Sequence, residues 1–305
     1  MTSKKEFTQI DWSETLADDC RQIVRLAIRE DLGQACDWTT VALAPADVRG
    51  RAAVVAREGG TVAGLPAARL ALDEMQVSVD WRPLAADGQT VSEGDRLAEL
   101  CGPVREMLTA ERLLLNLIGR LSGIATLTRQ FVQAVQGTAA RIYDTRKTPP
   151  GWRRLEKYAV RCGGGRNHRT GLFDAVLIKD NHLALMQLRP GEAVRRVREF
   201  LHAALADPDR ASALMIEAEV DTLEQLDDAL MANPDIILLD NMPISQLREA
   251  VVRRDAVNPE IELEASGGVN LDTVRAIAET GVDRISVGAL THSAVSLDVA
   301  LDWSA

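Results

Sequence analysis

A basic segment between residues 141 and 169 holds the side chains best suited to bind anions. Its cations are Arg141, Arg146, Lys147, Arg153, Arg154, Lys157, Arg161, Arg166 and Arg169, and only Asp144 and Glu156 oppose them. Arg offers a planar fork that pairs with two carboxylate oxygens at once, whereas Lys is a compact point charge suited to phosphate. Arg146 beside Lys147 could therefore serve two different anions, although either could equally be a solvated surface charge.

Acidic residues inside apolar runs form a second group with chemical potential. Glu217 and Glu219 alternate, which places both carboxylates on one face of a strand. A buried carboxylate is costly unless it has a cation or metal partner. Mg²⁺ prefers few carboxylates together with substrate phosphates and waters, and Glu219 with Asp240 would suit it.

Two Gly-containing segments, Ser266–Gly268 and Val287–Ala289, could bind a phosphate group. They lack bulk, so backbone N–H groups at a following helix start can point at a phosphate. A Gly pair alone is also an ordinary strand-to-helix turn. Of the histidines, His168 lies in the basic loop between Asn167 and Arg169 and favours ligand contact, whereas His292 favours a local cap or core contact.

The elements that must position these residues are short apolar runs alternating with amphipathic helices. The expected strands are residues 141–144, 175–179, 213–219, 235–240, 261–265 and 284–287, and Asp221 and Asn270 are candidate helix N-caps. Such alternation favours an α/β fold with a parallel sheet or a (β/α) barrel, whose active residues lie at the carboxyl ends of the strands. A complete barrel has about eight strands, so an incomplete or distorted barrel is equally consistent.

The first part of the chain has a different pattern. Short strands such as 52–56 and 95–100 are punctuated by Pro and Gly, and a helix follows from about residue 104 to 130. We expect a smaller α+β amino-terminal domain over residues 1–120 and a barrel domain over 121–290. The tail 291–305 is a candidate to pack back on the first domain. No linker-like tract separates the two domains, so we expect them to pack together.

Composition excludes several classes of protein. The 305-residue chain has a net charge of −10, which disfavours broad nucleic-acid binding. No apolar run approaches the roughly 20 residues that span a bilayer, and the first residues lack the apolar core of a signal peptide. We therefore expect a cytoplasmic enzyme without a membrane partner. The cysteines Cys20, Cys36, Cys101 and Cys162 are scattered and favour reduced thiols.

Motifs spread over nearly the whole chain occur in an order typical of one enzyme family. They are Asp144–Thr148, Glu156–Val160, Gly163–Arg169, Lys179–His182, Glu217–Asp221, Leu238–Met242, Glu264–Val269 and Ser286–His292, with Arg29–Gly33, Gly64–Pro66 and Glu111–Thr126 nearer the amino terminus. Together they resemble the quinolinate phosphoribosyltransferase family. Two loops, at residues 34–36 and 149–152, depart from the family pattern and leave the charged positions intact.

The resemblance implies a role for each matching position. Arg146, Arg169, His168 and Arg112 would grip the two carboxylates of quinolinate, with Arg112 supplied by a neighbouring subunit. Lys147 and Lys179 would lie near the pyrophosphate and ribose, while Glu219 and Asp240 would hold Mg²⁺, partly through substrate and water, and ribose hydroxyls. Those four would be the catalytic residues. The other substrate-binding residues would be Thr145 and, around the 5′-phosphate, Ser266, Gly267, Gly268, Val287, Gly288 and Ala289.

The implied enzyme is a pentosyltransferase of pyridine nucleotide biosynthesis. It would join quinolinate to phosphoribosyl pyrophosphate with Mg²⁺ and release pyrophosphate and CO₂, giving nicotinate mononucleotide on the route to NAD. Its expected assembly is a homodimer, or an oligomer built from dimers, with shared active sites.

Three alternatives stay open at the level of the sequence. A related phosphoribosyltransferase could act on another ring acid such as nicotinate, although several Arg residues favour a dicarboxylate. A non-catalytic, transport-associated homologue would be expected to lose some of Lys147, Lys179, Glu219 or Asp240, and all four are present. A doubly wound phosphoribosyltransferase would need a second acid and a phosphate loop after residues 236–242, and both are missing.

Overall fold

The computed structural model describes residues 5–304, which divide into two compact units. The barrel unit contains residues 5–9, 130–146 and 166–289, and the α+β unit contains residues 10–129, 147–165 and 290–304. The units are interleaved along the chain, whereas the sequence suggested two successive domains with a boundary near residue 120. The long helix α4 (Val104–Ala134) begins in one unit and ends in the other.

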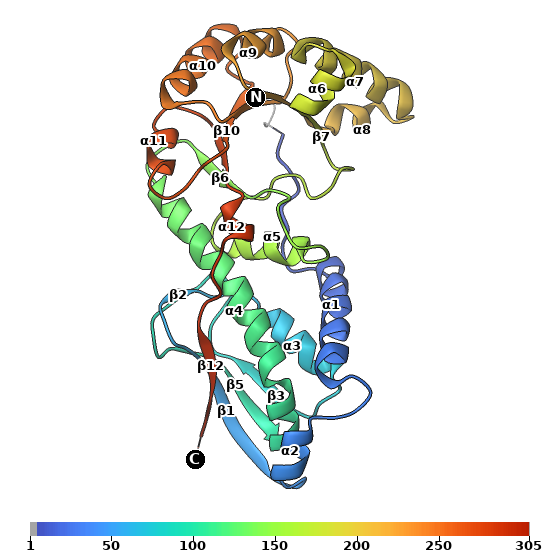
Figure 1. Ribbon diagram of the computed structural model, residues 1–305, viewed down its shortest axis with the longest axis vertical. Coiled ribbons are helices and arrows are strands. Elements are labelled where there is room, and N and C mark those ends of the chain that lie inside the picture. Colours follow the sequence, from blue (N-terminus) through green and yellow to red (C-terminus); the bar gives the residue numbers. More distant parts are fainter. Residues whose placement is uncertain (1–4, 305) are drawn as a thin grey trace. The chain divides into compact units, whose positions relative to one another are not determined.

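A six-stranded parallel sheet forms the centre of the barrel unit (Figure 1). Its strands lie in the order β6 (Arg141–Tyr143), β11 (Arg284–Ser286), β10 (Glu262–Ser266), β9 (Ile236–Asp240), β8 (Ile216–Val220) and β7 (Val176–Ile178). All six expected strands are confirmed. A parallel bridge between Arg166 and Tyr143 extends the sheet by one residue beyond β6. An incomplete, barrel-like α/β fold is therefore the architecture of this unit.

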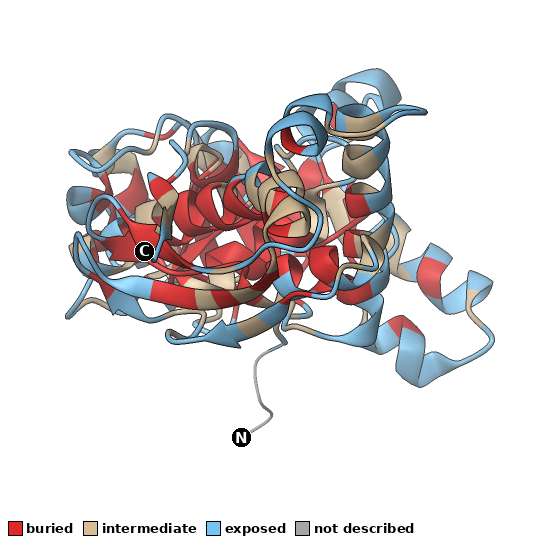
Figure 2. Ribbon diagram, turned by 90° about the horizontal axis from the view of Figure 1, so that it is seen from below, coloured by how far each residue is buried: buried red, intermediate tan, exposed pale blue. Residues whose placement is uncertain are grey.

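Helices follow the strands of the barrel unit as the alternating pattern predicted. They are α6 (Asp180–Met186), α7 (Pro190–Ala204), α8 (Pro208–Ala213), α9 (Leu223–Leu230), α10 (Ile244–Val257) and α11 (Val274–Ala278). Thr222 caps α9 through a hydrogen bond from the backbone N–H of Gln225, so the expected cap at Asp221 is wrong by one residue. Figure 2 shows buried residues along the strands and on the inner faces of helices, and exposed residues in the connecting turns.

The α+β unit is built on an antiparallel sheet in the order β12 (Val299–Trp303), β1 (Arg49–Ala56), β5 (Arg96–Pro103) and β3 (Asp80–Pro83). A second, two-stranded sheet pairs β2 (Gly60–Thr61) with β4 (Thr90–Val91). The unit's helices are α1 (Glu14–Leu32), α2 (Trp38–Leu43), α3 (Leu65–Glu74), α5 (Arg153–Cys162) and the first part of α4. A short helix, α12 (Ala289–His292), begins at the last residue of the barrel unit and continues in this one.

Residues near the carboxyl end of the chain complete the larger sheet of the α+β unit. Strand β12 pairs antiparallel with β1, and Ala52 lies opposite Trp303 in this register. Arg57 forms an ion pair with Asp302 beside these strands. Within residues 5–304, no helix combines the length and apolar character needed to cross a bilayer.

Candidate active site

Most of the predicted site residues lie at one edge of the parallel sheet. Thr145 and Arg146 follow β6, Lys179 follows β7, Glu219 lies in β8, and Asp240 and Ser266 end β9 and β10. Gly267 and Gly268 follow β10, and Val287, Gly288 and Ala289 follow β11. The carboxyl ends of parallel strands share an edge, and the register confirms this because Ser266 lies directly opposite Asp240.

Arg146 and Arg169 bring two positive charges together within the barrel unit. The Arg169 side chain is buried, and its Nη1 donates to the carbonyl oxygen of Ala175 at 3.4 Å. Burial lowers the pKa of Arg169, and the charge of Arg146 lowers it further. The Nε atom of Arg146 is itself buried and has no hydrogen-bond partner among the described residues. Two cations in this arrangement can attract an anion.

Carboxylate oxygens lie at the ends of β8 and β9. Lys179 Nζ donates to Glu219 Oε2 at 2.7 Å, and Asn241 Nδ2 donates to Asp240 Oδ2 at 2.8 Å. Glu219 and Asp240 both line a cleft of about 470 Å³ formed by residues after β8 and around α6 and α7. Two carboxylates with room for water and substrate oxygens fit the ligands that Mg²⁺ prefers.

The turn after β10 requires glycine. Gly267 has a φ of +94°, and a Cβ atom there would lie 2.2 Å from Asn241 Oδ1. Gly268 is also left-handed, with a φ of +62°. The backbone N–H of Asn241 donates to the carbonyl oxygen of Ser266 at 2.9 Å and ties this turn to the end of β9. A closely held turn without side chains is suited to approach by a phosphate group.

His168 lies inside the barrel unit, between two buried carboxylates. Its Nε2 atom is 3.0 Å from Glu217 Oε2 and 3.5 Å from Glu264 Oε1. Burial lowers the pKa of His168, but the two carboxylates outweigh burial and raise it to about 10. Burial raises the pKa of Glu217. Both shifts favour retention of a proton between His168 and Glu217.

Hydrogen bonding at the other nitrogen of His168 argues against a metal at this cluster. The atoms of His168, Glu217 and Glu264 lie close enough to hold a metal ion. However, the backbone N–H of Arg169 donates to His168 Nδ1 at 2.8 Å, which requires a lone pair on Nδ1 and places the ring proton on Nε2. This bond disagrees with a doubly protonated ring. The Nε2 proton therefore faces the carboxylates, and Nε2 has no lone pair to offer a metal.

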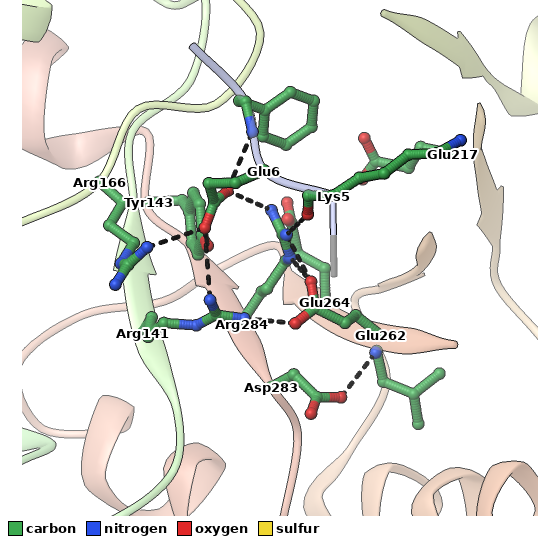
Figure 3. Close-up of polar contacts among 12 residues, drawn as sticks. Lys5, Glu6, Arg141, Tyr143, Arg166, Glu217, Glu262, Glu264, Asp283 and Arg284 are labelled. Atoms are coloured by element: carbon green, nitrogen blue, oxygen red, sulfur yellow. Dashed lines mark hydrogen bonds and ion pairs between the residues drawn. The ribbon is translucent and has the colours of Figure 1, made fainter. Parts of the chain in front are cut away.

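A larger ionic network lies at the opposite ends of the same strands (Figure 3). The fully buried Arg284 pairs with Glu262 and, at 3.2 Å, with Glu6. Arg141 also pairs with both carboxylates. Glu6, Glu262 and Arg284 were not predicted from the sequence as interacting residues. The alternation of Glu262 with Glu264 was a usable signal, because it repeats the pattern of Glu217 and Glu219.

Lys147 and Arg112 belong to the α+β unit. The carbonyl oxygen of Lys147 accepts a hydrogen bond from Thr291 Oγ1 at 2.7 Å. Arg112 is exposed on α4 and makes no ion pair within the described part of the chain. His292, for which a local contact was favoured, is close to Ser293, with Nδ1 and Oγ 2.7 Å apart.

Comparison with known proteins gives the same assignment over both parts of the chain. Residues 37–122 match the model of the quinolinate phosphoribosyl transferase N-terminal domain, and residues 124–302 match that of the C-terminal domain. A carboxylating nicotinate-nucleotide pyrophosphorylase of Mycobacterium leprae is 47% identical over 93% of this chain and 97% of its own length. A probable one from Synechocystis is 42% identical over 90% of this chain and 89% of its own length.

Solved structures agree with these relatives. The nicotinate-nucleotide pyrophosphorylase of Francisella tularensis superposes with a TM-score of 0.87 at 35% identity, over 98% of this chain and 100% of the other. NadC from Streptococcus pyogenes superposes with a TM-score of 0.85 at 34% identity, over 97% and 99% of the two chains. Matches to both domain models and to relatives over most of their length leave one conclusion: this chain belongs to the quinolinate phosphoribosyltransferase family.

Proposed function

We propose that this enzyme transfers the phosphoribosyl group of phosphoribosyl pyrophosphate to quinolinate and releases pyrophosphate and CO₂, giving nicotinate mononucleotide. The observation that favours quinolinate as the acceptor is the proximity of Arg146 to the buried Arg169. Quinolinate has two adjacent carboxylates, and two guanidinium groups held together match them in number and charge. Nicotinate has one carboxylate and would leave one of these cations unpaired.

The residues at the strand ends divide between the two substrates. Arg146 and Arg169 orient the quinolinate carboxylates, and Lys147 and Lys179 attract the phosphoribosyl donor. The turns at Ser266–Gly268 and Val287–Ala289 receive the 5′-phosphate through backbone N–H groups. His168 stabilises this arrangement from the interior of the barrel unit, because its Nε2 atom already faces Glu217 and Glu264.

Mg²⁺ is the metal that the donor atoms of the site suit. Glu219 and Asp240 would hold it together with substrate oxygens and water, and the ion supplies neutralising charge for the departing pyrophosphate. Lys179 Nζ, which donates to Glu219 at 2.7 Å, adds a positive charge of the chain itself near this position.

The reaction requires orientation and charge stabilisation, and no residue has to act as a nucleophile. As the bond from ribose C1 to pyrophosphate breaks, C1 gains oxocarbenium character and the pyridine nitrogen attacks it. The ring nitrogen becomes cationic. The bond to the 2-carboxylate then breaks, CO₂ leaves, and the cationic nitrogen stabilises the electron pair on C2 until a proton takes its place. Interactions that bind the departing carboxylate too tightly would stabilise the ground state rather than the transition state.

A direct assay tests the reaction. The protein is incubated with quinolinate, phosphoribosyl pyrophosphate and Mg²⁺, and nicotinate mononucleotide and CO₂ are measured. Equimolar products are expected, and nicotinate in place of quinolinate should give little nucleotide. Efficient use of nicotinate without release of CO₂ would contradict the proposed acceptor.

We further propose that active sites are shared in a homodimer, with Arg112 completing the site of the partner subunit. Arg112 is exposed and carries no ion pair within residues 5–304, so it is available to another chain. A two-fold dimer repeats each contact and forms two such sites.

Mixing two inactive variants tests the sharing of sites. Arg112→Ala subunits mixed with Lys147→Ala subunits should regain activity, because one site of each mixed dimer receives both wild-type residues. Subunit exchange is checked by mass. No return of activity after verified exchange would refute the sharing of sites, and each variant mixed with itself is the control.

A further inference from the structure

The amino-terminal segment Glu6–Gln9 is built into the barrel unit. The Glu6 carboxylate accepts a hydrogen bond from Tyr143 Oη at 2.7 Å and pairs with Arg166 at 2.9 Å and Arg141 at 3.3 Å (Figure 3). Burial raises the pKa of Glu6, but Arg284, Tyr143 and other groups outweigh burial and lower it. These contacts fix the segment beside β6, the strand that leads to Arg146.

Phe7 contacts His168, which directly precedes Arg169, one of the proposed quinolinate-binding residues. Its ring is buried and stacks on the His168 ring, with centroids 4.3 Å apart and planes at 27°. It shares a core cluster with Tyr143 of β6, Ala175 and Met215 just before β7 and β8, and Ile236 of β9. Phe7 therefore belongs to a cluster that joins β6 to the residue just before β7, the first and last strands in the order of the sheet.

Gln9 makes the most specific contact of the segment. Its Nε2 donates to the carbonyl oxygen of Asn167 at 3.2 Å, and its Oε1 accepts from the backbone N–H of Asn167 at 2.9 Å. The amide side chain thus holds both backbone polar groups of one residue. A further bond from Gln9 Nε2 to the carbonyl oxygen of Phe7, at 2.8 Å, fixes the side chain in this orientation.

Asn167 passes this constraint to the segments that carry the two arginines. Its Nδ2 donates to Asp144 Oδ2 at 2.7 Å, and the backbone N–H of His168 donates to Asp144 Oδ1 at 2.8 Å. Asp144 is fully buried and lies two residues before Arg146, while Arg169 lies two residues after Asn167. One chain of hydrogen bonds therefore runs from Gln9 through Asn167 to Asp144.

We propose that Gln9, together with Asn167, is a positioning residue that sets the spacing of Arg146 and Arg169 for a pyridine dicarboxylate. This inference rests on the proposed function of the two arginines. Neither Gln9 nor Asn167 needs to touch the substrate. Gln9 holds the backbone that leads to Arg169, and Asn167 connects that backbone to the segment that leads to Arg146. Loss of either link lets the guanidinium groups separate, which weakens binding of a rigid dicarboxylate and leaves the phosphoribosyl donor unaffected.

The test compares Gln9→Ala and Asn167→Ala with the wild type in steady-state kinetics with both substrates varied. Each variant should raise the KM for quinolinate about tenfold, because Gln9→Ala removes the bonds to the Asn167 backbone and Asn167→Ala removes the bond to Asp144. The KM for phosphoribosyl pyrophosphate should stay within about twofold. Because the two residues act in series, the double variant should be about as impaired as either single one. Lys5→Ala is the matched control, because Lys5 directly precedes the segment but pairs with Asp235.

The outcomes separate this inference from the proposed function. A wild-type protein that does not consume quinolinate refutes both. If the wild type is active, an unchanged quinolinate KM in the variants, an equal rise in both KM values, or strictly additive effects refutes the positioning role. Circular dichroism of each variant checks the fold. If Gln9→Ala does not fold, Asn167→Ala alone decides between a selective and a general loss.

Discussion

Replacement of Arg284 by Met tests the ionic network inside the barrel unit. The Arg284 side chain is fully buried, and its guanidinium contacts the carboxylates of Glu262 and Glu6. Met retains a flexible apolar chain but removes the charge. Breaking a buried pair from one side leaves the partner charged and unpaired, which costs about 3–5 kcal/mol. Glu6 keeps its pairs with Arg141 and Arg166, and Glu262 keeps its pair with Arg141. We therefore expect a loss at the lower end of this range, about 3 kcal/mol in the free energy of unfolding.

Urea unfolding at pH 7 measures this loss, provided that the signal reports on the barrel unit. All five Trp residues, at positions 12, 38, 81, 152 and 303, lie in the α+β unit, so far-ultraviolet circular dichroism is preferable to Trp fluorescence. Arg69→Met is the control, because it breaks an exposed pair with Asp73 and should cost about 0.3–0.5 kcal/mol. Adding Glu262→Gln to the Arg284 variant should recover part of the loss. A loss no larger than that of the control would refute the reasoning.

Five further variants test the site and the network. Arg146→Lys keeps the charge but loses the bidentate fork, so the quinolinate KM should rise far more than that of phosphoribosyl pyrophosphate; equal kinetics would contradict the role. Glu219→Gln and Asp240→Asn should weaken Mg²⁺-dependent turnover with the fold retained, as a magnesium titration would reveal. Gly267→Ala places a Cβ against Asn241 at a positive φ, so we expect a raised KM for phosphoribosyl pyrophosphate in initial-rate kinetics. Because the pKa of Glu6 is lowered below 4.5, its ionised form stabilises the fold above that pH and this contribution is lost as the pH falls through the lowered pKa. The stability difference between wild type and Glu6→Gln should therefore shrink below about pH 4.5 in urea titrations, and a constant difference would count against the ion pairs.

The sequence predicted the strands of the barrel unit and the edge that carries the site, because both depend on local patterns. Apolar runs that end in charged or Gly residues place Glu219, Asp240 and Ser266 at strand ends whatever the rest of the chain does. The cap of α9 shows the limit of local reasoning. Asp221 and Thr222 can both cap a helix, and only the backbone geometry selects Thr222.

Contacts between distant segments could not be predicted in this way. Glu6 and Arg284 are 278 residues apart, and no local pattern indicates that they pair. The His168 ring faces Glu217 and Glu264, which lie on two different strands. Its neighbours in the basic loop suggested contact with a ligand, because the sequence shows charges along the chain and not across the sheet.

The pairing of β12 with β1 has a consequence for how the chain folds during synthesis. Ala52 and Val54 are made early but receive their partners, Trp303 and Leu301, only when the last strand emerges. Until then one edge of β1 exposes unpaired backbone groups, which another strand could bind. Such long-range closure slows folding and favours aggregation of incomplete chains. Chains released before residue 299 should therefore depend on chaperones more than full-length chains do.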